Sequence, residues 1–211
     1  MENQSVIALF PHAKNTERLK VTRSRVENDI ARGSRALSKS DILKICTAIK
    51  QGSRNPVRDE LMVLTAFYHG LRVSELCSLR WQQITFKPPQ IAVKRVKNGI
   101  DAVHPIFDKR LLTLLRKLHK EQGNPNQGFI FLNERGNPVS VNGFQQMFRK
   151  FSKMATGIIW NAHALRHACG TSMIDAGQPI RTVQLWLGHA NIQNTIKYLH
   201  ESGKQFDNVV F

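Results

Sequence analysis

Signals for the start and the end of helices recur along the chain from Ser38 onward. Ser38 and Asp41 are spaced as in a capping box, in which two side chains cap the first turn of a helix. The apolar residues that follow lie on one helical face: Ile42, Leu43, Cys46 and Ile49. Further helix starts are expected at Asn55-Pro56, Asp108, Ser140 and Pro179. The pattern predicts a mainly helical domain.

One segment has a different periodicity and predicts a β-hairpin. Residues 91–93 and 103–106 are β-type runs on either side of Asn98-Gly99. An Asn-Gly pair between such runs is a strong signal for a tight hairpin turn. The expected fold class is therefore mainly α with a small antiparallel β-hairpin sheet, an α+β arrangement.

Length and composition favour one folded domain with an arm. The chain has 211 residues, of which 41% are hydrophobic, enough to bury a core. Residues 1–36 are basic and polar without a strong period and predict an N-terminal arm, which leaves residues 37–211 as the domain. Apolar runs long enough for a membrane span and a secretion signal are both missing, so we expect a cytoplasmic protein. The three cysteines are far apart and are expected to be reduced, buried thiols.

The net charge points to a polyanionic partner. Lysine and arginine number 31 against 15 aspartate and glutamate residues, which gives a formal charge of +16. Such a protein attracts nucleic acid. A basic protein without such a partner is the alternative that charge alone leaves open.

Several polar residues have the chemistry that breaking a phosphodiester by transesterification needs: a nucleophile, cations for the transition state and a proton donor. Arg72 follows a glycine helix stop at the start of a new helix, and Glu75 is spaced to brace it. His163 and Arg166 are three residues apart and share a helical face. Taken singly, each is as easily an ordinary surface pair.

Two further residues complete the set, and one competing interpretation concerns metal. His189 follows a glycine turn, and Tyr198 comes nine residues later, where a half-buried tyrosine would also be ordinary. His163 and His167 are spaced like zinc ligands, but a zinc protease helix has glutamate where this chain has Ala164. We therefore expect no metal, and we expect His167 to support the fold or the site.

Taken together, these motifs resemble the tyrosine recombinase family, also called phage-type integrases. The matching text is GLRVSEL at 70–76, HALRH at 163–167, LGH at 187–189 and Tyr198. The resemblance covers about residues 37–200, the catalytic domain of the family. It implies the tyrosine recombinase catalytic-domain fold and an enzyme that cuts and rejoins DNA without a cofactor, a metal or ATP.

The resemblance also implies a role for each residue. Arg72 and Arg166 would bind the non-bridging oxygens of the scissile phosphate, and His189 would donate a hydrogen bond to it. His163 would act as acid or base beside Tyr198, which would form a 3′-phosphotyrosine. The family has a lysine in its hairpin that protonates the leaving 5′ oxygen. Counting back from the proline after the hairpin favours Lys97, with Lys94 as the alternative.

The short segment before the catalytic domain and the residues of the hairpin resemble those of the fimbrial phase-switch recombinases within the family. This likeness implies double-stranded DNA with specific recombination sites as the partner and a homo-tetramer on DNA, and it leaves open whether accessory proteins that bend DNA take part. It implies a location at the bacterial nucleoid. Inversion, integration and excision remain open, because the outcome depends on how the sites are oriented. The competing functions are a silent DNA-binding regulator with this fold and DNA relaxation of the type IB topoisomerase kind.

Overall fold

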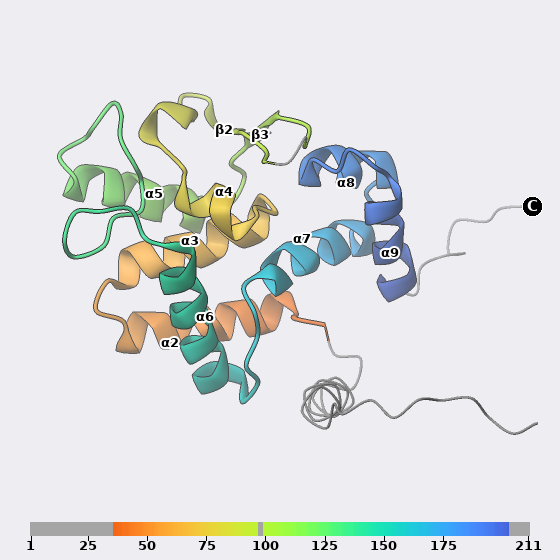
Figure 1. Ribbon diagram of the computed structural model, residues 1–211, viewed down its shortest axis with the longest axis horizontal. Helices are drawn as coiled ribbons and strands as arrows, with labels where there is room; N and C mark the ends of the chain where they lie inside the picture. Colours follow the sequence, from red (N-terminus) through yellow and green to blue (C-terminus); the bar gives the residue numbers. More distant parts are fainter. Residues whose placement is uncertain (1–35, 97–98, 203–211) are drawn as a thin grey trace, which may run out of the picture. The chain divides into compact units, whose positions relative to one another are not determined.

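Helices dominate the computed structural model, and one small sheet interrupts them (Figure 1). The structure describes residues 36–96 and 99–202, without the side chains of residues 200–202. Its first half contains α2 (Lys39–Gly52), α3 (Pro56–Tyr68), α4 (Val73–Cys77), the 3-10 turn η1 (Trp81–Gln83), β1 (Ile84–Phe86), β2 (Pro89–Val93) and β3 (Ala102–Pro105). Its second half contains α5 (Lys109–Glu121), α6 (Val141–Thr156), α7 (His163–Asp175), α8 (Ile180–Leu187) and α9 (Gln193–Ser202). The predicted fold class, mainly α with a small antiparallel sheet, is confirmed.

The capping signals at the first two described helices have different outcomes. At α2 the predicted capping box is present, with Ser38 Oγ accepting from the Asp41 N–H at 3.1 Å and Asp41 Oδ2 accepting from the Ser38 N–H at 3.3 Å. At α3 Pro56 occupies the first turn as predicted, but the Asn55 side chain makes no cap hydrogen bond. The backbone N–H of Asn55 donates to Ser53 Oγ at 3.0 Å.

The core is built from the apolar faces of these helices. α2 packs on α3 and α6, and α3 also packs on α5 and α7. The aromatic face of α6 lies in this core, where Phe144, Phe148 and Phe151 are buried. The three cysteines are free and buried, as predicted. None of the described helices has the length and apolar character that crossing a bilayer requires.

The predicted hairpin is present, but its connection is longer than the expected tight turn. β2 and β3 pair antiparallel from Gln90↔Pro105 to Val93↔Ala102, so residues 94–101 form the connection rather than Asn98-Gly99 alone. The reason lies in Arg95, whose N–H donates to the Asp101 side chain instead of to a neighbouring strand. A third strand, β1, extends the sheet in the order β1-β2-β3 and was not foreseen.

Two glycine turns bring distant segments together beside α7. Gly70 follows α3 with φ 56°, and Gly188 follows α8 with φ 66°, a region of backbone space that favours glycine. A Cβ on Gly70 would lie 2.4 Å from Leu187 Cδ2, so the ends of α3 and α8 approach closely. α7, α8 and α9 pack on one another, as the blue part of Figure 1 shows.

The N-terminal arm predicted over residues 1–36 lies, apart from Ala36, outside the described residues. The division of the chain at that point stays a prediction.

Candidate active site

Arg72 stands at the start of α4, directly after the Gly70 turn. Its Nη1 donates to Glu75 Oε1 at 2.7 Å, and its backbone N–H donates to Glu75 Oε2 at 2.8 Å. Glu75 therefore braces both the arginine and the helix start, as its spacing predicted. The Arg72 side chain keeps 27% of its surface exposed, so its guanidinium can still meet a ligand.

Arg166 lies on α7 and joins the two glycine turns. Only 2% of the residue is exposed, and its Nη1 and Nη2 donate to Gly70 O at 2.6 Å and to Leu187 O at 2.8 Å. Each Nη carries two hydrogens, so each keeps one for a further acceptor. The turns that precede Arg72 and His189 are thereby fixed to one guanidinium.

His163 begins α7 and lies one turn before Arg166. The residue is exposed, and its ring meets the His167 ring edge-on with 4.7 Å between centroids. His167 in turn meets the Tyr198 ring edge-on at 5.6 Å. His167 thus links His163 to the tyrosine through ring contacts, the supporting position that the sequence predicted.

His189 is held by the helix that carries the tyrosine. Its Nδ1 forms a 2.8 Å hydrogen bond with Thr195 Oγ1, and its backbone carbonyl accepts from Gln184 Nε2 at 2.9 Å. Thr195 is fully buried and His189 is 7% exposed. With Nδ1 engaged, the remaining ring nitrogen, Nε2, is the one left to face a ligand.

Tyr198 lies on α9 with only 1% of its surface exposed. Its ring is stacked on that of His189 at 6.4 Å, and the Lys197 ammonium lies 5.2 Å from the ring centroid. It packs so closely on α7 that a Cβ on Gly170 would lie 2.9 Å from two of its ring carbons. The tyrosine is therefore beside the histidines, but its phenol is covered.

Burial and nearby positive charges lower the pKa values of His163, Arg166 and His189. Burial, and then the charges of Arg166 and Arg72, lower the pKa of His189 to about 4. Partial burial, followed by the electrostatic effects of His167 and Arg166, lowers the pKa of His163 to about 4 as well. Burial, Arg95 and Arg72 lower the pKa of Arg166 to about 10, which still leaves it charged at pH 7. The hydrogen bonds of Arg166 to Gly70 O and Leu187 O bring it beside the segments that carry Arg72 and His189.

The two candidate lysines are less well defined. Lys97 lies outside the described residues, and Lys94 is exposed just after β2. Their roles stay predictions. Sequence reasoning missed two other residues of this region, Arg95 and Thr195. Thr195 lies one helical turn before Tyr198 and could have been suspected from that spacing, whereas nothing in the sequence marks Arg95 as buried.

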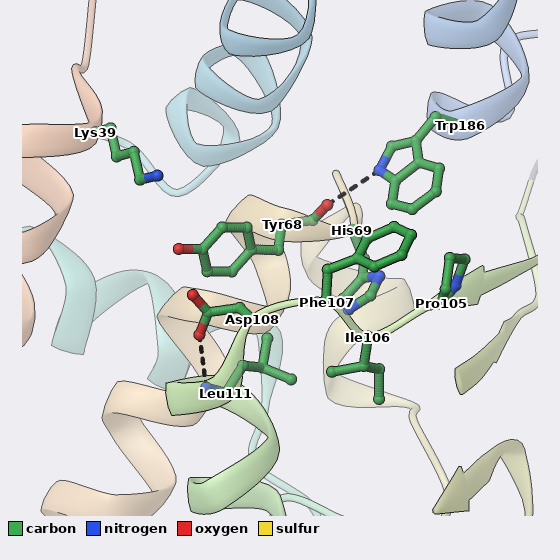
Figure 2. A pocket seen from close by; sticks show the side chains of 9 residues that line it. All are labelled: Lys39, Tyr68, His69, Pro105, Ile106, Phe107, Asp108, Leu111 and Trp186. Atoms are coloured by element: carbon green, nitrogen blue, oxygen red, sulfur yellow. Dashed lines mark hydrogen bonds between the residues drawn. The ribbon is translucent and has the colours of Figure 1, made fainter. Parts of the chain in front are cut away.

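The second tyrosine of the chain, Tyr68, lies in a different setting. It lines a pocket of about 250 Å³ together with Lys39, Asp108, Phe107 and Trp186. Figure 2 shows its phenol pointing toward Asp108. Burial and the hydrogen bond with Asp108 raise the pKa of Tyr68 to about 12. Among the described residues that line this pocket there is no arginine, so Tyr68 is a poor alternative nucleophile.

A stack of His69, His104 and Trp186 adjoins this pocket and makes stability depend on pH. The ring centroids of His104 and Trp186 are 3.9 Å apart, and those of His69 and His104 are 5.6 Å apart. Both histidines are buried, and burial followed by nearby cationic groups lowers the pKa of each to about 3. Neither ring nitrogen of His104 has a hydrogen-bond partner in the described part of the protein.

We expect the free energy of unfolding to fall as the pH drops below about 6.5, the value for an unfolded histidine, because only the unfolded chain then takes up the protons. Between pH 7 and pH 5, His104 should account for a loss of about 2 kcal/mol. Urea unfolding of His104→Phe at both pH values should therefore show a drop smaller by that amount. An unchanged drop would contradict the assignment.

Comparison with known proteins adds independent information. A sequence model of the phage integrase family matches residues 35–205. The chain is 30% identical over 178 residues to the type 1 fimbriae regulatory protein FimE of Escherichia coli K12, which covers 82% of this chain and 88% of FimE. It is 31% identical over 167 residues to the tyrosine recombinase XerA of Pyrococcus horikoshii, covering 78% of this chain and 56% of XerA. The crystal structure of XerA recombinase superposes with a TM-score of 0.69 at 23% identity, covering 84% of this chain and 64% of that one. The last likeness concerns the fold alone.

Proposed function

The chain belongs to the phage integrase family and is a tyrosine recombinase, and we propose that it cuts and rejoins DNA at specific sites with Tyr198 as its nucleophile. Arg166 bonds the carbonyls of Gly70 and Leu187, which precede Arg72 and His189 by two residues, and the His189 ring stacks on that of Tyr198. The observation that carries this proposal is this placement of Arg72, Arg166 and His189 beside Tyr198. These three cationic or hydrogen-bonding residues are called the phosphate clamp below.

The phosphate clamp binds the scissile phosphate. Arg72 and Arg166 donate to the two non-bridging oxygens, and His189 donates to the same phosphate from Nε2. Charge on these oxygens rises in the transition state, and fixed cations in a partly buried site stabilise it strongly. The free hydrogens of Arg166 and the exposed edge of Arg72 are what this role needs.

The remaining groups move protons. A phenol is mostly protonated at pH 7, so attack requires a base that takes its proton. His163 is neutral there because its pKa is about 4, and it accepts the proton that Tyr198 loses. The Tyr198 oxygen forms the new bond to phosphorus as the bond from phosphorus to the 5′ oxygen breaks. Lys97 protonates the departing 5′ oxygen. The product is a 3′-phosphotyrosine, which an incoming 5′ hydroxyl reverses without ATP.

The burial of Tyr198 adds a step before cleavage. With 1% of its surface exposed, the phenol reaches a DNA phosphate only after α9 shifts away from Gly170 and His167. The Thr195–His189 hydrogen bond joins His189 to the same helix, so His189 keeps its orientation relative to Tyr198 as α9 shifts.

The partner is double-stranded DNA, and the favoured outcome is inversion. The formal charge of +16 supports binding to a DNA backbone. The similarity to FimE, a regulatory protein of type 1 fimbriae, supports inversion of a DNA segment over integration or excision. We further propose that four copies assemble on two sites, with DNA-bending proteins as accessory factors.

Covalent capture tests the proposed function and identifies the DNA site in the same experiment. The full chain is incubated with a random-sequence duplex library that carries nicks, and protein–DNA adducts that survive denaturation are sequenced. We expect enrichment of one site, free 5′ hydroxyl ends and inversion of a plasmid segment between opposed copies of that site. Adducts without sequence preference, together with relaxation of any supercoiled plasmid, would favour a topoisomerase. Tight binding with no adduct would favour a silent regulator.

Thr195→Val should slow cleavage because valine keeps the shape of the side chain but cannot bond His189 Nδ1. We expect a decrease of roughly 10- to 100-fold in the rate of adduct formation on the captured site, since His189 loses its orientation. Thr195→Ser keeps the hydroxyl and should stay within about threefold of the original rate. Equal rates for the valine and serine variants would show that this hydrogen bond does not orient His189.

A further inference from the structure

Arg95, the second residue after β2, is a buried cation to which the proposed mechanism gives no role. Its side chain is 0% exposed, so its guanidinium does not reach a DNA phosphate. A fully buried arginine is costly unless its charge is paired and its N–H groups are bonded. Its charge and its N–H groups must therefore be satisfied by other parts of the protein.

The guanidinium of Arg95 connects three segments of the chain. Its Nη1 donates to Glu75 Oε2 at 2.8 Å and to Gly70 O at 3.3 Å. Its Nη2 donates to His69 O at 3.3 Å and to Trp186 O. One side chain thus joins the end of α3, the helix α4 and the last turn of α8.

Two of these acceptors are shared with arginines of the phosphate clamp. The Glu75 carboxylate receives Arg72 Nη1 on Oε1 at 2.7 Å and Arg95 on Oε2. Burial alone would raise the pKa of Glu75, but the hydrogen bonds and charges of Arg72 and Arg95 outweigh it and lower that pKa. Gly70 O likewise receives both Arg95 and Arg166 Nη1. Arg95 therefore shares a hydrogen-bond acceptor with each of the two clamp arginines.

The stem of Arg95 fits against the turn that carries the third clamp residue. A Cβ on Gly188 would lie 2.7 Å from Arg95 Cγ and Nε, and a Cβ on Gly99 would lie 2.6 Å from Arg95 Cβ. The Ile100 N–H donates to Gly188 O at 3.4 Å, a second contact with the same turn. His189 follows Gly188 directly, so its backbone is anchored against Arg95.

We propose that Arg95 is a positioning residue that sets the geometry of the phosphate clamp: it orients Arg72 through Glu75, Arg166 through the Gly70 carbonyl and His189 through the Gly188 turn. This inference rests on the proposed function. The competing role is that of a buried ion pair that only holds the fold together, which would affect every substrate equally.

A lysine at position 95 separates the two roles. It keeps the positive charge, but one ammonium on a flexible stem does not reach acceptors on three segments in the fixed geometry of a guanidinium. The readout is the rate of adduct formation on two versions of the captured site. One has an ordinary phosphodiester at the scissile position. The other has a methylphosphonate, in which a methyl group replaces one charged non-bridging oxygen and lessens the need for the clamp.

We expect Arg95→Lys to slow cleavage of the phosphodiester roughly 10- to 100-fold and that of the methylphosphonate less than about threefold, relative to the unmodified protein on each substrate. Arg72→Lys should show the same selectivity. The matched control is Arg58→Lys at the far end of α3, where Arg58 also pairs with a buried carboxylate, Asp59, and donates to Leu132 O. It should leave the ratio of the two rates unchanged.

Equal losses on both substrates, or no loss, would overturn the positioning role of Arg95. If Arg95→Lys does not fold, as judged by its thermal transition, Arg95→Gln gives the same test, because a glutamine amide still donates hydrogen bonds but cannot reach acceptors on three segments. The same selective loss is then expected, and an unselective one overturns the inference. Failure of the proposed function is distinguishable, because the unmodified protein would then form no adduct on either substrate.

Discussion

Tyr198→Phe is expected to abolish the covalent DNA adduct, with a decrease in rate of roughly 10⁴-fold or more, because the variant lacks the attacking oxygen. The phenylalanine ring fits the same place against Gly170 and His167, so the fold should be retained. DNA binding should also be retained, because the phosphate clamp is intact. Adduct yield on denaturing gels and the affinity for the captured site measure the two effects.

The chain provides its own control, because it has one other tyrosine. Tyr68→Phe removes a hydroxyl that faces Asp108 in the pocket of Figure 2 and should leave the rate of adduct formation within about threefold. The opposite pattern, in which Tyr198→Phe still forms the adduct and Tyr68→Phe does not, would contradict the assignment.

Arg166→Lys is expected to have the second largest effect, a decrease of roughly 10²- to 10³-fold in the rate of adduct formation. The lysine keeps a charge, but it cannot bond Gly70 O, Leu187 O and a phosphate oxygen at once. At least one buried carbonyl then loses its partner, which should also lower the free energy of unfolding by about 2 kcal/mol.

A matched control for Arg166 lies on the neighbouring helix. Arg149 on α6, the helix before α7, is exposed on the surface, so Arg149→Lys should change neither the rate nor the stability measurably. If Arg166→Lys cleaved DNA as fast as the unmodified protein while losing only stability, Arg166 would be a structural residue rather than part of the phosphate clamp.

Local signals in the sequence predicted the elements well. The capping box at Ser38, the aromatic face of α6 and the glycine stops after α3 and α8 depend on neighbours within a few residues, which a sequence displays directly. The hairpin was predicted for the same reason. The length of its connection was not predicted, because it depends on Asp101 accepting the Arg95 N–H, a contact that a periodic pattern does not reveal.

Some residues of the candidate site could likewise be predicted from the sequence, and others could not. The order and spacing of Arg72, His163, Arg166, His189 and Tyr198 suggested a common chemistry, and hydrogen bonds and ring contacts connect the segments that carry them. The positions of Arg95 and Thr195 arise from contacts between segments far apart in the sequence or between helices. The burial of Tyr198 follows from the packing of α9 on α7, and spacing along one helix cannot reveal such packing.

The identity of the residue that becomes joined to DNA decides whether the proposed chemistry is right. Mass spectrometry of the adduct, after nuclease and protease digestion, locates the residual nucleotide on a single peptide. We predict that it is attached through a phosphate to the oxygen of Tyr198. Attachment to Tyr68, or to any serine, cysteine or histidine, would contradict the central claim.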